Sequence, residues 1–268
     1  MVQSTTKPSV HKVGFISPPA WFDISPTEFL RIAPKNTIVM QAVMRLPDFN
    51  YQVDGVEQFI NSVPELRACF NSLTESGADV VTQFGYPFSL AHGWEKANKV
   101  QKSIQGSSRT SFVMMGVEIV YAMKHLNCKS IAIASTYYSG KMSSILHEYL
   151  LEAGFKILHS ENWQSQGIAE DKGSNLFIGD GELDPTAWKS PVDAIANAVR
   201  NVSKNASAAD CILVSGGGMR LLDIAETLEK EVGKPVIGGD LAIYWGILRR
   251  LGIKRSVRGH GKLLANLV

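Results

Sequence analysis

Hydrophobic and polar positions follow each other along the chain in an order that predicts strands alternating with helices. His11–Ser17 and Thr37–Met44 are mainly apolar runs, which predict the first strands. Within residues 64–76, apolar side chains recur at helical spacing: Leu66, Cys69, Phe70 and Leu73. Gly77 ends this helix, and the continuous apolar run Ala78–Phe84 follows. A helix followed by a buried strand is typical of a parallel sheet with helices on both faces.

The second half of the chain repeats this scheme. Apolar runs predict strands at Ser130–Ser135, Phe155–His159, Cys211–Ser215 and Pro235–Ile237. Amphipathic helices are expected between them, the last over Met219–Val232, and another is expected at Leu241–Arg250. The polar, glycine-bearing segment 162–180 is expected to form a loop able to fold over a site.

Two segments of the chain match each other and indicate an internal duplication. Ala78–Gly85 and Ala209–Gly216 both follow an amphipathic helix, both begin with Ala-Asp and both end at glycine. The match therefore predicts an α/β fold of two pseudo-symmetric, Rossmann-like lobes with a site in the cleft between them. Gly85 and Gly216 are expected to hold equivalent positions. The alternative is that any two parallel strands look alike.

The composition of the chain argues against several classes of protein, among them nucleic-acid-binding and membrane-spanning proteins. The 268 residues include 45% hydrophobic and 19% charged residues, as is ordinary for a folded globular protein. The formal net charge is only +2 and the basic residues are scattered along the chain, which argues against a nucleic-acid-binding surface. No apolar run reaches the ~20 residues of a membrane span, and the polar start has no signal-peptide core. Three widely spaced cysteines without a CxxC pair suggest neither disulfides nor a zinc site and fit a reducing cytoplasm.

The carboxyl ends of the predicted strands are rich in glycine and hydroxyl side chains and poor in charge. They are Ser17-Pro18-Pro19, Gly85-Tyr86-Pro87, Ser135-Thr136-Tyr137-Tyr138, Ser215-Gly216-Gly217-Gly218 and Gly238-Gly239-Asp240. Ligands of open parallel sheets collect at such ends, and free N–H groups there suit a carboxylate or enolate oxygen. A simple tight turn is the alternative at Ser215–Gly218, although three successive glycines exceed what a turn needs.

Several familiar motifs are absent from the sequence. Leu221 occupies the place of the third glycine in a GxGxxG fingerprint, and neither a GxxxxGK[ST] phosphate loop nor a GxSxG serine elbow occurs. The six histidines are dispersed and form no HExxH or HxH pattern, so no metal site and no bound cofactor are expected.

Motifs spread over nearly the whole chain carry a resemblance to a known family. They are Val13–Pro19, Glu28–Pro34, Gly77–Gly85, Ile131–Tyr137, Leu213–Leu222, Pro235–Ile237, Tyr244–Arg249 and Gly259–Leu264. In this order the sequence resembles the aspartate/glutamate racemase superfamily, in particular its arylmalonate decarboxylase and maleate cis–trans isomerase branch. The resemblance implies two α/β lobes, 1–127 and 128–248, with residues 249–268 returning to the first lobe.

The resemblance also implies a chemistry in which a cysteine from each lobe faces the bound carboxylic acid. Decarboxylases of the branch keep only the cysteine of the second lobe. In this sequence the two positions fall on Gly85 and Gly216. Cys69, Cys128 and Cys211 are expected to be core residues instead, since Cys211 begins its strand ~17 Å from the glycine end at ~3.3 Å per residue. Thiol-based catalysis is therefore not expected.

Other side chains are then candidates for catalysis. Tyr137 matches a family hydroxyl that binds substrate oxygens, and Tyr86 is expected to fill space left by the missing thiol or to move a proton. Asp240 is a candidate general base or a carboxylate that selects a cationic group of the substrate, and its alternative role is a helix N-cap. His260 is a candidate proton donor or a surface turn residue, and His92 is a lesser candidate. The predicted substrate-binding residues are Ser17, Pro18, Gly85, Tyr86, Ser135, Tyr137, Ser215, Gly216, Gly217 and Gly218.

The leading functional prediction is a cofactor-independent lyase or isomerase acting on a small carboxylic acid through an enolate-like intermediate. One alternative is a carboxylate-binding family member without catalysis, favoured by the two glycines. Another is a hydrolase in which Asp240 activates water. The expected partner is the small-molecule carboxylate, with no nucleic acid or membrane, in a possible homo-oligomer.

Overall fold

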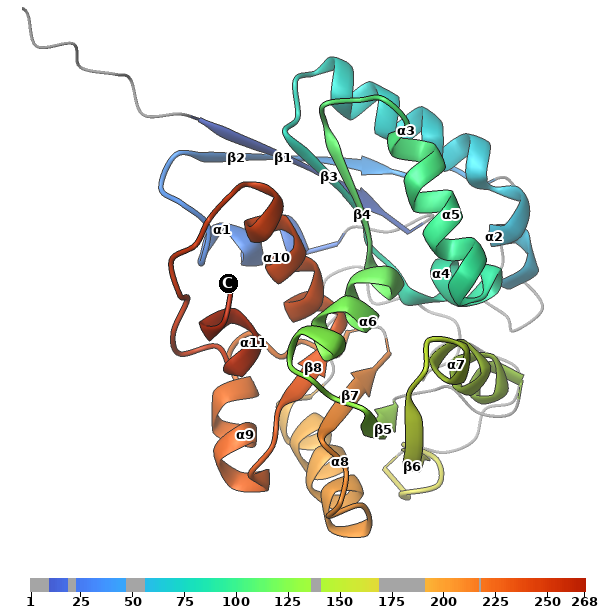
Figure 1. Ribbon diagram of the computed structural model, residues 1–268, viewed down its shortest axis with the longest axis vertical. Coiled ribbons are helices and arrows are strands. Elements are labelled where there is room, and N and C mark those ends of the chain that lie inside the picture. The colour runs from blue at the N-terminus through green and yellow to red at the C-terminus, as the bar shows by residue number, and fades with distance from the viewer. Residues whose placement is uncertain (1–9, 19–22, 47–55, 136–140, 169–190, 217) are drawn as a thin grey trace, which may run out of the picture.

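The computed structural model describes residues 10–18, 23–46, 56–135, 141–168, 191–216 and 218–268. These residues form two four-stranded parallel sheets, each flanked by helices, as the sequence pattern predicts (Figure 1). The described helices include none that combines the length and the apolar character required to span a bilayer.

The two sheets have the same strand order. The first runs β2-β1-β3-β4, with β1 at His11–Ser17, β2 at Thr37–Val43, β3 at Val80–Gln83 and β4 at Ser111–Met114. The second runs β6-β5-β7-β8, with β5 at Ser130–Ser135, β6 at Lys156–Asn162, β7 at Cys211–Ser215 and β8 at Val236–Gly238. In both sheets the second strand of the half lies at the edge, followed by the first, the third and the fourth. The pseudo-symmetric fold predicted from the duplication is therefore confirmed.

Helices cover both faces of the sheets. In the first half they are α1 (Ser25–Leu30), α2 (Gln58–Asn61), α3 (Val63–Glu75), α4 (Tyr86–His92), α5 (Trp94–Gln105) and α6 (Met115–His125). In the second half they are α7 (Lys141–Glu152), α8 (Val192–Asn205), α9 (Ala225–Val232), α10 (Gly239–Arg250) and α11 (Lys262–Ala265). The helix predicted from Met219 thus begins only at Ala225. The residues before it turn instead, because the Leu221 N–H donates to the Asp240 carboxylate, 2.7 Å away.

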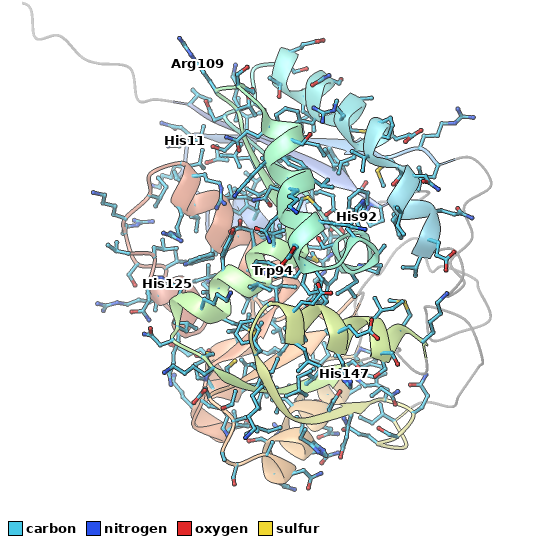
Figure 2. The ribbon with its side chains drawn as sticks, turned by 45° about the vertical axis from the view of Figure 1, so that its right-hand side comes forward. His11, His92, Trp94, Arg109, His125 and His147 are labelled. Carbon is cyan, nitrogen blue, oxygen red and sulfur yellow. The ribbon has the colours of Figure 1, made fainter. Side chains whose placement is uncertain are left out.

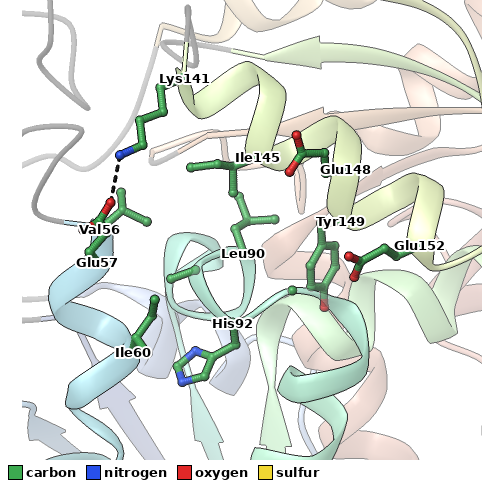
Figure 3. A pocket seen from close by; sticks show the side chains of 12 residues that line it. Val56, Glu57, Ile60, Leu90, His92, Lys141, Ile145, Glu148, Tyr149 and Glu152 are labelled. Carbon is green, nitrogen blue, oxygen red and sulfur yellow. Dashed lines mark hydrogen bonds and ion pairs between the residues drawn. The ribbon is translucent and has the colours of Figure 1, made fainter.

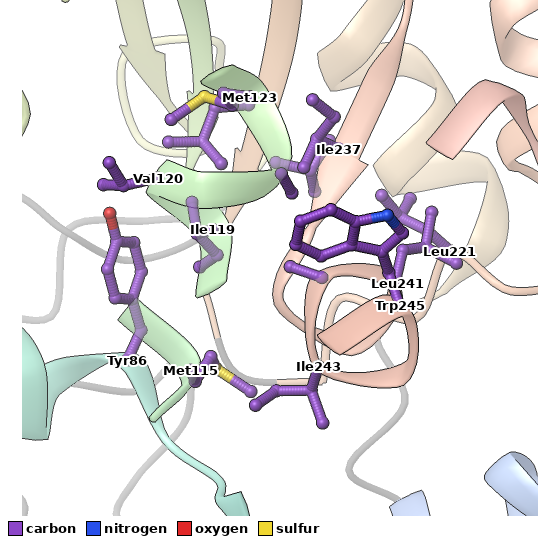
Figure 4. Close-up of a cluster of buried hydrophobic side chains, with 14 of the residues drawn as sticks. Tyr86, Met115, Ile119, Val120, Met123, Leu221, Ile237, Leu241, Ile243 and Trp245 are labelled. Atoms are coloured by element: carbon purple, nitrogen blue, oxygen red, sulfur yellow. The ribbon is translucent and has the colours of Figure 1, made fainter. Parts of the chain in front are cut away.

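Helices α6 and α10 join the two lobes. Each follows the fourth strand of its own half, and each also contacts the other half, α6 through β8 and α10 through β3 and β4. Their facing sides form a buried apolar cluster that includes Met115, Ile119 and the fully enclosed Trp245 (Figure 4). The boundary proposed at 248/249 therefore falls inside α10, which already packs on the first sheet.

Gly116 is expected to be intolerant of any side chain, because α4 and α6 meet closely there. A Cβ atom at this position would lie 2.3 Å from the Ser89 Cβ and 3.0 Å from the Tyr86 ring. We expect Gly116→Ala to lower the free energy of unfolding by about 1–3 kcal/mol through overpacking. Urea denaturation measures the change. Stability equal to the wild type would contradict the close packing of these helices.

Candidate functional site

Hydroxyl groups gather at the carboxyl ends of the strands, as predicted. Ser135 and Ser215 are paired in register at the ends of β5 and β7, and Ser17 ends β1. All three residues are buried. The Ser215 Oγ finds no hydrogen-bond partner within the described part of the chain. A buried hydroxyl without a partner is costly unless a ligand or water satisfies it, which marks this strand end as a candidate binding position.

Glycine turns follow β3 and β7. The φ angles are +112° at Gly85 and +142° at Gly216, values that side chains of L-residues rarely adopt. Pro18, from the end of β1, packs against Gly85, and a Cβ atom there would lie 3.1 Å from the proline Cγ. Both turns are therefore shaped for glycine, and a cysteine at either position would be strained.

Arg220 ties the second glycine turn to the first lobe. Its guanidinium lies 2.8 Å from the Asp23 carboxylate, 3.4 Å from that of Glu28 and 2.8 Å from the Ser25 hydroxyl. It also lies 5.3 Å from the centre of the Phe84 ring, whose residue precedes Gly85. With only 9% of its side chain exposed, Arg220 forms a buried ion cluster between the lobes.

Tyr244 completes this ion cluster from α10. Its hydroxyl lies 3.0 Å from a Glu28 carboxylate oxygen and donates to it. Burial raises the pKa of the Tyr244 hydroxyl well above its ordinary value, so the group stays protonated as a donor. The first-lobe segment 23–28 is thereby held from α10 as well as from Arg220.

Asp240 is the second residue of α10, and its carboxylate faces inward. Gly238, not Asp240, holds the N-cap position, so the predicted capping role is wrong. One Asp240 oxygen accepts the Leu221 N–H, and the other finds no partner among the described residues. Burial raises the pKa of the Asp240 carboxyl to about 6, against the opposing effect of the Arg220 charge. The residue therefore anchors the segment after the second glycine turn from within the protein.

Tyr86 and His260 lie in different surroundings. Tyr86 begins α4 directly after Gly85, and its buried ring meets the edge of Tyr149 from α7, with ring centres 5.9 Å apart. It thus packs between the lobes beside the apolar cluster of α6 (Figure 4). His260 is half-buried, and its Nδ1 donates to the Leu222 carbonyl oxygen at 2.7 Å. This places its ring beside the segment that follows the second glycine turn.

His92 lies at the other end of α4 from Gly85 and lines a separate cavity. This cavity, of about 270 Å³, lies between α2, α4 and α7 (Figure 3). An ion pair from Lys141 to Glu57, 3.0 Å long, crosses one side of it. The His92 Nδ1 donates to the Phe88 carbonyl oxygen, and burial lowers the pKa of the ring. The structure therefore does not bring His92 together with the glycine turns.

The other candidate residues lie away from the glycine turns or outside the described residues. Tyr137 and Gly217 lie outside the described residues. Cys128 and Cys211 are buried free thiols, and Cys211 begins β7 at the end opposite Gly216. The histidines are spread over the molecule, and the described residues contain no group of three or more side chains suited to a metal ion (Figure 2).

Sequence reasoning missed the ion cluster of Asp23, Glu28, Arg220 and Tyr244. One signal was present, since Arg220 interrupts the otherwise apolar run Met219–Leu222 after the three glycines. A charged residue in such a run is rarely buried without a partner. The partners, however, lie in the first lobe, nearly two hundred positions earlier.

Comparisons with known proteins agree with the fold described above. None of the curated proteins matches the chain. Among solved structures, a liganded double mutant of arylmalonate decarboxylase has 18% identity and a TM-score of 0.76, covering 95% of this chain and 98% of its own. The maleate isomerase of Pseudomonas putida S16 has 16% identity and a TM-score of 0.78, covering 97% and 100%.

A third solved structure is a mutant maleate cis-trans isomerase of Nocardia farcinica with a covalently bound succinylcysteine intermediate. It has 18% identity and a TM-score of 0.77, covering 96% of this chain and 99% of its own. At such identities these likenesses show the fold. The family model described as arylmalonate decarboxylase matches residues 13–171 and 186–264. The chain therefore belongs to the arylmalonate decarboxylase family.

Proposed function

We propose that the protein binds a small carboxylic acid between its lobes and converts it through an enolate-like intermediate without a catalytic cysteine. The observation that carries this proposal is the contact between the segments beside the two turns, where the guanidinium of Arg220, four residues after Gly216, lies 5.3 Å from the centre of the Phe84 ring, next to Gly85. The Ser215 hydroxyl, which has no hydrogen-bond partner among the described residues, adds a donor at the end of β7. Donors aimed at a developing negative charge are the main means by which enzymes stabilise enolates.

The residues divide into two roles in this proposal. The N–H groups of Gly216–Gly218 and the hydroxyls of Ser135 and Ser215 hold the carboxylate or enediolate oxygens, and Ser17, Pro18 and Gly85 form the facing wall. Tyr137 adds the hydroxyl implied by the family resemblance. His260 is our candidate for proton transfer, because its half-buried ring is fixed through Nδ1. Tyr86 and Asp240, both buried, support the site through packing and anchoring.

A screen in deuterium oxide tests the proposed reaction. The purified protein is incubated with phenylmalonate, maleate, amino acids and lactones, and products are followed by proton NMR. We expect turnover of at least one carboxylic acid, with deuterium incorporated at the carbon next to the carboxylate, because an enolate takes its new proton from the exchangeable pool. Tight binding of one compound without turnover of any would refute the enzymatic proposal.

Tight binding without turnover would support a carboxylate-binding protein without catalysis. This alternative is favoured by the glycines at both positions where a cysteine was expected. A hydrolase would be identified by incorporation of labelled oxygen from water into the product. The placement of Asp240 speaks against water activation, because the residue is 2% exposed and already accepts the Leu221 N–H.

Ser215→Ala is expected to reduce kcat for the carboxylic acid that is turned over by about 10²–10³-fold, the effect of removing one oxyanion donor. Steady-state kinetics measure this loss. Ser111→Ala is the matched control, since Ser111 lies in the other sheet, at the amino end of β4, and its substitution should leave kcat unchanged. Equal kinetics of the Ser215 variant and the wild type would exclude the hydroxyl from the reaction.

A further inference from the structure

Arg220 contacts segments on both sides of the candidate site. Its Nη1 donates to the Ser25 hydroxyl and to Glu28, and its Nη2 donates to Asp23. These residues follow the end of β1 in the first lobe. The guanidinium also lies over the Phe84 ring, one residue before Gly85. Its own backbone comes two residues after Gly218, so one side chain links the segments that lie next to the two glycine turns.

The arrangement does more than tether the lobes. An exposed ion pair, Arg31 to Asp223, already links α1 to the segment after the second glycine turn. A buried ion pair costs desolvation energy that a surface pair does not, so it adds little as a mere tether. The planar guanidinium donates in two directions from a rigid fork, and this fixes an angle as well as a distance. Such a contact is suited to orienting a backbone turn.

A second anchor acts on the same segment. The Asp240 carboxylate accepts the Leu221 N–H, one residue after Arg220, at 2.7 Å. The side chain of residue 220 and the backbone of residue 221 are thus both held, the first from the first lobe and the second from α10. The segment 218–221 therefore has little freedom to shift.

We propose that Arg220 is a positioning residue that sets the distance and angle of the segment from Gly218 to Leu221 relative to the Gly85 turn. Its meaning for catalysis rests on the proposed function, because the N–H groups it orients are those assigned to the carboxylate. Arg220 itself does not touch the substrate. It acts through the turn, whose amides must lie within hydrogen-bond distance of a defined oxygen position.

Hydrogen exchange of backbone amides tests the proposal without any ligand. Arg220→Lys keeps the charge and removes the fork, and Arg31→Lys is the matched control at the exposed pair. We expect amides within 216–222 of Arg220→Lys to exchange about ten-fold faster or more, as loss of a charged hydrogen bond implies. The control should exchange like the wild type there. Asp23→Asn, which keeps the shape of the Arg220 partner, should change the same amides in the same direction.

A binding measurement then connects the turn to the site. The dissociation constant for phenylmalonate, measured by calorimetry, is expected to rise about ten-fold or more in Arg220→Lys and to stay unchanged in Arg31→Lys. Unchanged exchange in folded Arg220→Lys would overturn the inference. If that variant fails to fold, unchanged exchange in Asp23→Asn would overturn it equally. A wild-type protein that binds no carboxylate would refute the proposed function, and the exchange result would still decide the role of Arg220.

Discussion

Arg220→Met is expected to lower the free energy of unfolding by about 3–5 kcal/mol. Methionine fills much of the arginine volume but leaves the buried carboxylates of Asp23 and Glu28 without their cation. An uncompensated buried charge is among the most destabilising changes a single substitution can make. Urea denaturation at pH 7.5, followed by tryptophan fluorescence, measures the loss.

Arg31→Met provides the matched control for this experiment. Arg31 also bridges the first lobe to the segment after the second glycine turn, through Asp223, but about half of each side chain is exposed. Exposed ion pairs contribute about 0–1 kcal/mol, so the control should unfold almost like the wild type. A similar loss in both variants would contradict the buried character of the Arg220 cluster.

Asp240→Asn is expected to remove a pH dependence of stability. Burial raises the pKa of the Asp240 carboxyl from 3.8 to about 6, so the folded protein binds this proton more tightly than the unfolded chain. Its favourable contribution is therefore present below pH 4 and is lost as the pH rises through about 6. Two pKa units correspond to about 3 kcal/mol. Asparagine still accepts the Leu221 N–H, so relative to the wild type the variant should gain about this amount between pH 4 and 7.5.

Asp210→Asn should show the opposite sign and serves as the comparison. Hydrogen bonds from the Ser130 and Lys129 amides lower the pKa of the exposed Asp210 carboxyl. Its contribution is therefore present above the unfolded pKa and lost as the pH falls. Urea midpoints of both variants across pH 3.5–7.5 test the pair. Parallel curves for Asp240→Asn and the wild type would show that the Asp240 carboxyl is not perturbed.

The sequence predicted the bounds of the two central strands of the second sheet but missed the start of helix α9. The predicted bounds of the strands Cys211–Ser215 and Ser130–Ser135 are those of the structure, because a continuous apolar run between polar residues leaves little choice of where the strand begins and ends. The helix expected from Met219 was wrong in its first turn. There Leu221 gives its N–H to Asp240 rather than to a helical carbonyl, a contact that local pattern does not contain.

The candidate site likewise has one part that the sequence predicts and another that only the tertiary structure shows. Its glycine turns and strand-end serines are local features, since a positive φ favours glycine and a buried strand ends where its apolar run ends. Gly85, Gly216 and Ser215 could therefore be named from the sequence alone.

The buried ion cluster required the tertiary structure. Arg220 and Asp23 are 197 positions apart, and Tyr244 reaches Glu28 over 216 positions. Periodicity shows which face of an element is buried but not which distant charge lies opposite it. The two lobes bring those charges together. Because Asp240 and Tyr86 are themselves buried in this arrangement, Asp240 anchors a turn and Tyr86 packs between helices. Sequence alone thus determined the two sheets and the glycine turns at their strand ends, while the relative placement of the lobes decided which side chains support those turns.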